Sequence, residues 1–414
     1  MLSLFGRATA QSRVAANASK LGRNLAAAWR AHSFRLSAFP DIAAEHLADP
    51  RSWDCAWQEI IEWVICNDEL PYQQFFDSDF GEPALTLYWH PRFYLQALFW
   101  ASSTTAVHNH SFAGAFKVIE GSSLQTVYTF ETTDEVAEQL HMGSLRVQRS
   151  EVLLKGTVHQ IRPGPAFIHS VFHLDRPSVT LVARTHSDVD PLTRLEYLGP
   201  HVAYAPFLVD QQRTRRLDAL ALLRKVSPGR YATLAAEMVR ASDAVTAFTV
   251  LRQDHAAQPT DRSASALYRI AKNRWARWTD LWYDVFLEET RQKTGLQLRG
   301  RILSPHLRLL IGLLLTQKTS ADVVRQVDLY ARSASPVHTL IGWIHELCHE
   351  GVFSFPLDRL TDDIIAAMIQ LKSVDPLHIV TFVTQGGRAS QTPEVIRHRV
   401  SAIGSTPILL PLFR

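Results

Sequence analysis

A succession of short β-prone runs between residues 83 and 186 constrains the fold more than any other feature of this 414-residue sequence. The runs read ALTLYW, RFYLQALFWA, AFKVIEG, SLQTVYTF, LRVQRSEVLL and PSVTLVART, and Gly, Pro, Ser or Asp residues separate them. Many short strands joined by turns are typical of a closed β-barrel or a sandwich. We therefore expect a β-barrel domain over residues 81–190.

The sequence changes character on both sides of this segment. Before it, the stretch DPRSWDCAWQEIIEWVIC places apolar residues at three- and four-residue intervals, which indicates helix over 41–76. After it, LSPHLRLLIGLLL and ASPVHTLIGWIHELCHEG each begin with Ser-Pro, a helix-start signal. We predict an α+β chain with a helical lead-in over 41–80 and an α-helical domain of unknown role over 191–414.

The first 40 residues form a basic N-terminal tail. Six basic residues precede the first acid, Asp41, and Leu21, Leu25 and Trp29 recur at helical spacing. This composition fits an organelle transit peptide and equally a basic amphipathic tail, but it lacks the continuous apolar core of a secretory signal. We favour a surface helix or a loose tail, with organelle targeting as the alternative.

Composition limits the class of protein. A hydrophobic content of 46% with 20% charged residues describes a globular chain, and a net charge of +3 is too small to argue for nucleic acid. Three cysteines without CxxC spacing indicate a reducing compartment. The most apolar stretch, residues 306–315, is too short to cross a bilayer. We expect a soluble, cytoplasmic protein, with its oligomeric state left open.

Histidines occur where a metal site could form. His108 and His110 are one residue apart, so on a strand they point to the same side. They are either a polar pair at a solvated edge or part of a metal site. A second segment, KGTVHQIRPGPAFIHSVFHL, carries His159, His169 and His173. We favour His169 as the third ligand, while His159 or His173 would replace it or orient a ligand by hydrogen bonding.

Three neutral imidazoles are a suitable donor set for a divalent first-row metal, and they leave coordination positions open. The segments RFYLQALFWASSTTAVHNHSFAGAFKVIEGSSLQ and FIHSVFHLDRPSVTLVA resemble the thiol dioxygenase branch of the cupin family, which includes cysteine dioxygenase and 3-mercaptopropionate dioxygenase. The resemblance covers about residues 45–186. It implies a cupin barrel (a double-stranded β-helix, or jelly roll) that holds Fe(II) on His108, His110 and His169 and oxidises a small thiol with O₂.

The sequence departs from this family around the metal. Ala115 stands where eukaryotic members carry a cross-linked Cys, and the family's Ser-x-His-x-Tyr relay reads Thr180, Val182 and Arg184. The family's carboxylate-binding arginine falls near Thr86, so the identity of the substrate cannot be carried over. The remaining candidates are anion-binding arginines (Arg92, Arg184), tyrosines that would bind substrate (Tyr88, Tyr94), and groups beside the ligands or reacting atoms (Thr180, Tyr128, His159, His173).

Two other functions compete with an oxygenase. One is a cupin that binds a metal or ligand without turnover and engages a partner through its helices. The other is a zinc metalloprotease, because HELCH at residues 345–349 matches H-E-x-x-H. Against the protease, Glu350 follows directly, no third histidine lies at the extended spacing, and Leu340, Ile344 and Leu347 form an ordinary core-facing stripe. We therefore interpret HELCH as a coincidental pair.

Overall fold

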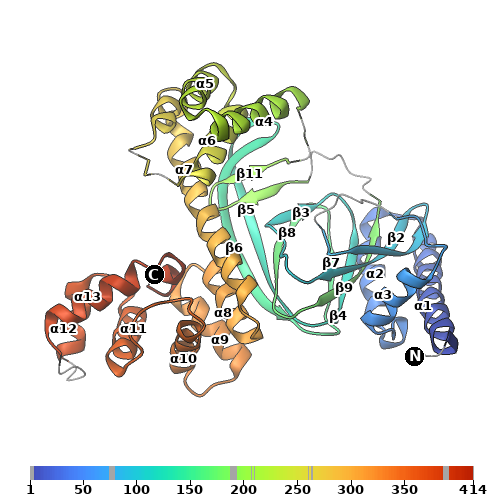
Figure 1. Ribbon diagram of the computed structural model, residues 1–414. Helices are drawn as coiled ribbons and strands as arrows, with labels where there is room; N and C mark the ends of the chain where they lie inside the picture. The colour runs from blue at the N-terminus through green and yellow to red at the C-terminus, as the bar shows by residue number, and fades with distance from the viewer. Residues whose placement is uncertain are drawn as a thin grey trace. The chain divides into compact units, whose positions relative to one another are not determined.

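The computed structural model describes residues 4–73, 80–186, 194–206, 208, 210–259, 261–262, 264–385 and 391–413. The chain divides into two compact units. The first contains Met1–Arg149 and Leu153–Thr290, and the second contains Ser150–Val152 and Arg291–Arg414. The expected boundary at residue 190 lies outside the described residues. The chain is a mixed α+β protein, with its strands in the first half and helices at both ends (Figure 1).

Two groups of strands form the first unit's β-structure. One is a five-stranded sheet in the order β1-β2-β9-β4-β7, and the other is a closed barrel in the order β10-β11-β6-β5-β8-β3. The expected closed barrel is therefore confirmed. The strands are β1 (Ala84–His90), β2 (Phe93–Trp100), β3 (His108–His110), β4 (Gly114–Glu120), β5 (Ser123–Ala137), β6 (Leu140–Leu153), β7 (Val158–Ile161), β8 (Gly164–His173), β9 (Ser178–Thr185), β10 (Glu196–Leu198) and β11 (Val202–Tyr204).

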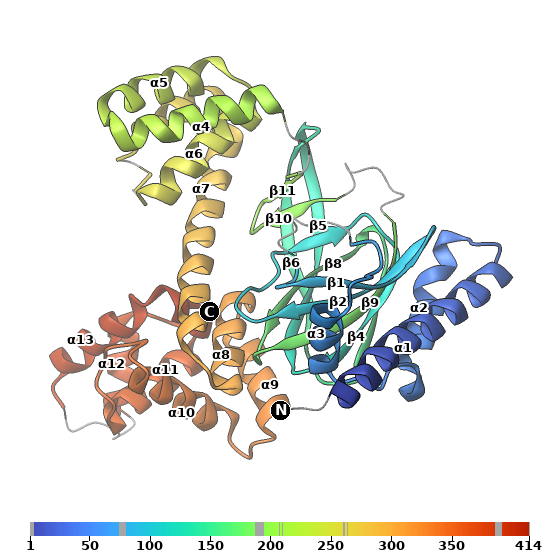
Figure 2. The ribbon, with the colours of Figure 1, turned by 45° about the vertical axis from the view of Figure 1, so that its right-hand side comes forward.

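Strands β10 and β11 correct the prediction that the chain is helical from residue 191. They pair with each other, and β11 pairs with β6 while β10 pairs with β3, so both belong to the barrel (Figure 2). Each strand is only three residues long. A run of that length contains too few alternations to give a periodic signal in the sequence.

The N-terminal helices cover the outer face of the five-stranded sheet. They are α1 (Leu4–Ala31), α2 (Phe39–Ala48) and α3 (Trp57–Cys66), with short 3-10 turns η1 (Leu36–Ala38) and η2 (Pro50–Ser52) between them. Leu21, Leu25 and Trp29 of α1 are 3%, 0% and 2% exposed and join one core cluster with Phe39 and Leu181. The basic segment is therefore a layer of the core and not a loose tail. The expected continuous helix over 41–76 is interrupted between α2 and α3.

Strand alternation gives the sheet a second, interior face. On β9, Val179, Leu181 and Ala183 belong to the helix-facing cluster, whereas Val182 belongs to an interior cluster between the two groups of strands. That interior cluster consists of Phe112, Phe116, Val118, Val127, Leu153, Ile161, Phe167 and Val182. Because Arg184 is two residues beyond Val182, the alternation turns its side chain toward the same interior.

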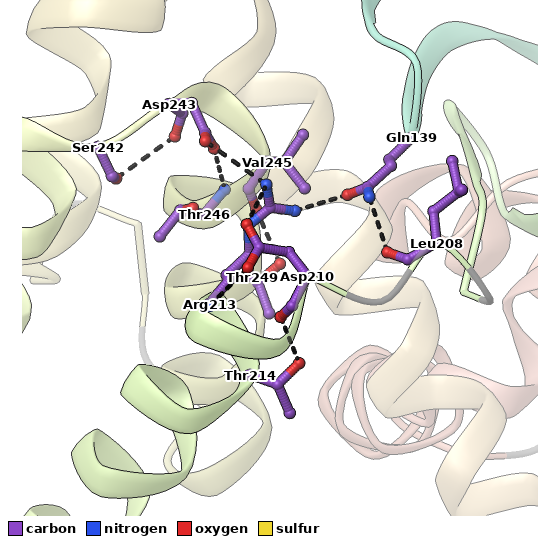
Figure 3. A network of polar contacts seen from close by, with 10 residues as sticks. All are labelled: Gln139, Leu208, Asp210, Arg213, Thr214, Ser242, Asp243, Val245, Thr246 and Thr249. Atoms are coloured by element: carbon purple, nitrogen blue, oxygen red, sulfur yellow. Dashed lines mark hydrogen bonds and ion pairs between the residues drawn. The ribbon is translucent and has the colours of Figure 1, made fainter.

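Further helices complete the first unit. They are α4 (Gln211–Val226), α5 (Pro228–Ala241), α6 (Ala244–Ala257) and the first part of α7 (Ala266–Arg301). Arg213 on α4 donates to Gln139 at the turn between β5 and β6 (2.5 Å) and pairs with Asp210 and Asp243 (Figure 3). Trp282 on α7 donates to the sulfur of Met142 on β6. Residues 211–290 are therefore part of the barrel unit, which corrects the single helical domain expected from residue 191.

The second unit is helical apart from residues 150–152. Its helices are the end of α7, α8 (Pro305–Thr316), α9 (Ser320–Ala331), α10 (Pro336–His349), α11 (Arg359–Leu371), α12 (Pro376–Gln385), α13 (Pro393–Gly404) and the 3-10 helix η4 (Pro407–Phe413). A proline at the first helical position starts α8 and α10, as the Ser-Pro pairs predict. Within the described residues, no single helix is long and apolar enough to span a membrane, although α11 and α12 together pass that test as a pair bent by 114°.

Candidate metal centre

Three histidines from two separate segments meet inside the barrel. His108, His110 and His169 each offer one ring nitrogen, and these atoms all lie within 4.8 Å of one another. The three side chains are 2%, 6% and 4% exposed. In the part of the chain that the structure describes, this is the only group of three or more His, Cys, Asp or Glu residues with such spacing.

Strand pairing brings the three residues together. His108 on β3 is the direct partner of His169 on β8, and the register shifts before His110, which lies opposite Gly164. Asn109 between the two histidines points the other way, where its side chain donates to Tyr197 and accepts from the backbone N–H of Leu195. The period of two along β3 therefore aims both imidazoles at β8.

Hydrogen bonds select the nitrogen that each of two histidines presents. Nδ1 of His108 lies 2.8 Å from the carbonyl oxygen of Ala106, so it carries the hydrogen, and Nε2 is buried with no hydrogen-bond partner in the described part of the chain. Nδ1 of His169 lies 3.1 Å from Oε1 of Gln125, which leaves its Nε2 2.9 Å from Nε2 of His110. Two nitrogens that bind one metal at about 2.1 Å and at right angles are about 3.0 Å apart. The spacing of the His110–His169 pair is therefore that of two ligands of one metal ion, and His108 offers a third nitrogen within 4.8 Å of both.

Burial and neighbouring groups keep all three imidazoles neutral near pH 7. Burial lowers the pKa of His108 to about 4, and it lowers the pKa of His110 and His169 well below 6.5. The neighbouring histidines and the guanidinium groups of Arg184 and Arg194 lower the pKa of His110 further. Because a neutral imidazole has the lone pair that a metal requires, the site is ready to bind a cation without releasing protons.

Arg184 and Tyr94 form a polar pair beside the histidines. They are direct cross-strand partners on β9 and β2. The guanidinium carbon of Arg184 lies 3.4 Å from the centroid of Phe112, whose ring is 4.7 Å from that of His110. Nε of Arg184 and the hydroxyl of Tyr94 are buried and have no hydrogen-bond partner among the described residues. Burial lowers the pKa of Arg184 to about 10, so this side chain is a cation that an anionic ligand would stabilise.

His159 and His173 do not join the cluster. His173 lies 2.9 Å from the hydroxyl of Ser123 and stacks on Trp100 at 4.6 Å. His159 stacks on Phe116 at 5.7 Å and lines a surface cleft of about 620 Å³ between α2 and β7. Of the three histidines in the downstream segment, the structure brings only His169 to His108 and His110.

The structure places Tyr128 on the face of the β5–β8 pair opposite the ligands and Thr180 on the interior face of β9. Tyr128 pairs with Ile168, the residue before His169, and packs in a different cluster with Tyr197. Because neighbouring residues on a strand face opposite sides, Tyr128 is on the wrong face of the β5–β8 pair. Thr180 lies between Leu98 and Val118 on β9, on the same face as Val182 of the interior cluster. The expectation for Tyr128 is therefore corrected, and the role expected for Thr180 stays a prediction.

The expectation that Tyr88 and Arg92 bind substrate is also corrected. Tyr88 packs against the helix-facing core, where its ring fills the space beside Gly22 on α1. Arg92 lies at the turn between β1 and β2 and stacks over Phe34 at 4.6 Å, on the helix side of the sheet. The predictions for Tyr88 and Arg92 did not take into account that α1 covers this face of the five-stranded sheet.

The side chains of the HELCH motif contact polar neighbours and form no metal cluster within the described residues. His345 pairs with Asp362 at 2.6 Å, Glu346 pairs with His306 at 2.8 Å, and His349 is exposed at the end of α10. Leu340, Ile344 and Leu347 form the buried stripe that was expected. The described residues around the motif supply no third ligand.

Several residues that shape the histidine cluster were not predicted from the sequence. Gln125 and the carbonyl of Ala106 orient two histidines, while Phe112 and Phe167 pack on imidazole rings. One signal for Gln125 was present. Ser123, Gln125 and Val127 alternate along one face of a strand, and Val127 on that face is buried. A polar residue on a buried face needs a hydrogen-bond partner, which marks Gln125 as a residue with a specific contact.

Glu82 anchors the loop that leads to His108. Its carboxylate accepts hydrogen bonds from the backbone N–H groups of Ala101, Ser102 and Ser103 and from the hydroxyl of Ser102. Desolvation opposes ionisation, but these hydrogen bonds outweigh it and lower the pKa of Glu82 to about 2.

We predict a pH dependence from this anchor. A carboxyl group whose pKa falls on folding contributes stability above its unfolded pKa of 4.5, and that contribution is lost as the pH falls toward 2. Solvent screening at this exposed position reduces the expected contribution to about 1–2 kcal/mol. Urea unfolding at pH 7 and pH 3 should show the wild type losing a little over half of this amount, about 1 kcal/mol, relative to Glu82→Gln, because at pH 3 the folded-state carboxyl is still largely ionised. Equal losses in the two proteins would contradict the prediction.

Comparison with known proteins gives little further information. No protein-family model matches the chain, and no curated protein sequence matches it. Among solved structures, it is similar to a chain described under "Crystal structures of DMSP lyases RdDddP and RnDddQII". That match has 13% sequence identity and a TM-score of 0.25, and it covers 44% of this chain and 94% of the other. A likeness of this size assigns neither a fold nor an activity.

Proposed function

We propose that this protein is a cupin-type, non-haem Fe(II) oxygenase that oxidises a small molecule with O₂, most simply a thiol. The observation that carries the proposal is the convergence of His108, His110 and His169, all buried and neutral, on one point. The order of the motif along the chain supports the cupin assignment, since His-x-His on one strand is completed by a histidine from a later strand. The resemblance to thiol dioxygenases supports the choice of substrate.

The chemistry of the donor set favours oxygen and thiolate as ligands. Three neutral donors leave the full charge of a divalent ion in place, with coordination positions free. When bound, Fe(II) would supply redox chemistry and a positive centre for an anionic sulfur. In the net reaction, a thiolate and O₂ give a sulfinate, so sulfur loses four electrons, O₂ gains four, and both oxygen atoms end on sulfur. No external reductant is needed.

The protein's own side chains would orient the substrate. Arg184 offers a buried cation whose charge acts on His110, and its cross-strand partner Tyr94 offers a buried hydroxyl; together they would hold an anionic group such as a carboxylate. The Phe112 ring contacts both the guanidinium of Arg184 and the ring of His110. Burial of the histidines would exclude bulk water from the reacting atoms.

An oxygen electrode tests the proposal. Iron-loaded wild type is mixed with a panel of small thiols with and without a carboxylate, and the products are identified by mass spectrometry. We expect O₂ uptake with at least one thiol and a mass gain of two oxygen atoms in the product. Metal binding without O₂ uptake across the panel would favour the non-catalytic binding protein. Loss of zinc and of peptidase activity in His345→Ala would favour the protease.

A further inference from the structure

We propose that Gln125 is a positioning residue that fixes the tautomer of His169 and preserves the positive charge of the metal centre. The inference rests on the metal site of the proposed function, but not on its oxygen chemistry. Gln125 is fully buried on β5, and its Oε1 lies 3.1 Å from Nδ1 of His169.

The contact determines which nitrogen of His169 is available. If Nε2 provides the lone pair for a metal, Nδ1 must carry the hydrogen, and Oε1 of Gln125 accepts it. His108 has the same arrangement with a different acceptor, the backbone carbonyl of Ala106 at 2.8 Å. Two of the three histidines are thus held with Nδ1 on an acceptor. Of the two acceptors, only that of Gln125 is a side-chain atom, so it is the one that a point mutation can remove.

The position of Gln125 in the strand ensures this contact. It pairs with Val171, two residues from His169 on β8, while Val127 pairs with His169 directly. Gln125 and Val127 therefore share the interior face with the ligand. A buried amide is costly unless it is hydrogen-bonded, and an apolar residue would suit the neighbouring interior cluster better. The contact with His169 gives the amide oxygen of Gln125 a hydrogen-bond partner at this buried position.

The neutrality of Gln125 has an electrostatic consequence. A carboxylate in its place would accept the same hydrogen but would add a negative charge next to a ligand. No carboxylate belongs to the histidine cluster within the described residues, and Arg184 and Arg194 both act on His110 as positive charges. Gln125 therefore orients His169 without reducing the attraction of the site for an anionic ligand.

Two substitutions at this position test the proposal with Co²⁺ as the metal and azide as the anion. Affinity for Co²⁺ is measured by competition with a chromophoric chelator, and azide is titrated into the Co²⁺-loaded protein by visible absorption. For Gln125→Leu we expect Co²⁺ affinity to fall about 10- to 100-fold. For Gln125→Glu we expect Co²⁺ to bind at least as tightly as in the wild type, while azide binds at least about threefold more weakly.

Because Co²⁺ affinity is expected to fall in Gln125→Leu but not in Gln125→Glu, the two variants distinguish a positioning role of Gln125 from a general packing role. Gln326→Leu is the control, since this buried glutamine donates to the backbone of Ser150 and lies outside the histidine cluster. Its Co²⁺ affinity should equal that of the wild type, whatever its unfolding midpoint. Parallel losses of Co²⁺ affinity in Gln125→Leu and Gln125→Glu, or no loss in Gln125→Leu, would overturn the proposal. Absence of O₂ uptake by the iron protein would end the oxygenase proposal and leave this result intact.

Discussion

His169→Ala should lose at least about a hundredfold in metal affinity, because it removes one of the three donors that the described residues supply and not merely a group that orients one. The measurement is the metal-induced rise in unfolding free energy. At a metal concentration of about 100 times the dissociation constant, the wild type should gain about 2.7 kcal/mol, and the variant should gain almost nothing at the same concentration. His108→Ala should behave in the same way.

Two histidines provide matched controls for this prediction. His173 lies in the same segment but contacts Ser123 and Trp100, and His345 belongs to the HELCH motif. His173→Ala and His345→Ala should keep the full metal-induced stabilisation. If His173→Ala lost it while His169→Ala kept it, the ligand assignment would be wrong. If His345→Ala lost it, the metal would belong to the helical unit.

Arg184→Met should weaken anion binding about 10- to 100-fold without destabilising the fold. The range follows from about 1.5–3 kcal/mol for a hydrogen bond to a charged group. Methionine has a similar length and can keep the packing on Phe112, while the removal of a cation whose Nε is buried and unpartnered relieves a desolvation penalty. Azide or carboxylate titration of the Co²⁺-loaded protein and urea unfolding measure the two effects.

Arg92→Met is the matched control, because this arginine stacks on Phe34 on the helix side of the sheet. Its anion affinity should equal that of the wild type. Unchanged anion affinity in Arg184→Met would contradict the assigned role. A large loss of stability in that variant would instead indicate that Arg184 has a structural role.

The sequence predicted the parts of the site that depend on local pattern. A period of two places His108 and His110 on one face, and the turn residues Pro163 and Gly164 lead into the strand that carries His169. The same period places Arg184 on the interior side of β9. These inferences required only knowing which residues form strands, and not how the strands pair.

The failed predictions depended on which strands pair and on what covers each face. Tyr128 lies opposite Ile168 and not opposite His169, so it faces the other side of the sheet, and this pairing depends on the register of β5 against β8. Tyr88 and Arg92 would have been reasonable site residues if α1 and α2 did not cover their side of the sheet. The basic composition of α1 obscured its buried stripe of Leu21, Leu25 and Trp29. Tertiary packing decided each case.

One metal ion is expected to bind where the three imidazoles meet. Diffraction from crystals of the iron-loaded wild type, measured on both sides of the iron absorption edge, would locate that ion. We expect one anomalous peak within bonding distance of a ring nitrogen from each of His108, His110 and His169. A peak at His345 and His349, or none near the three barrel histidines, would contradict this expectation.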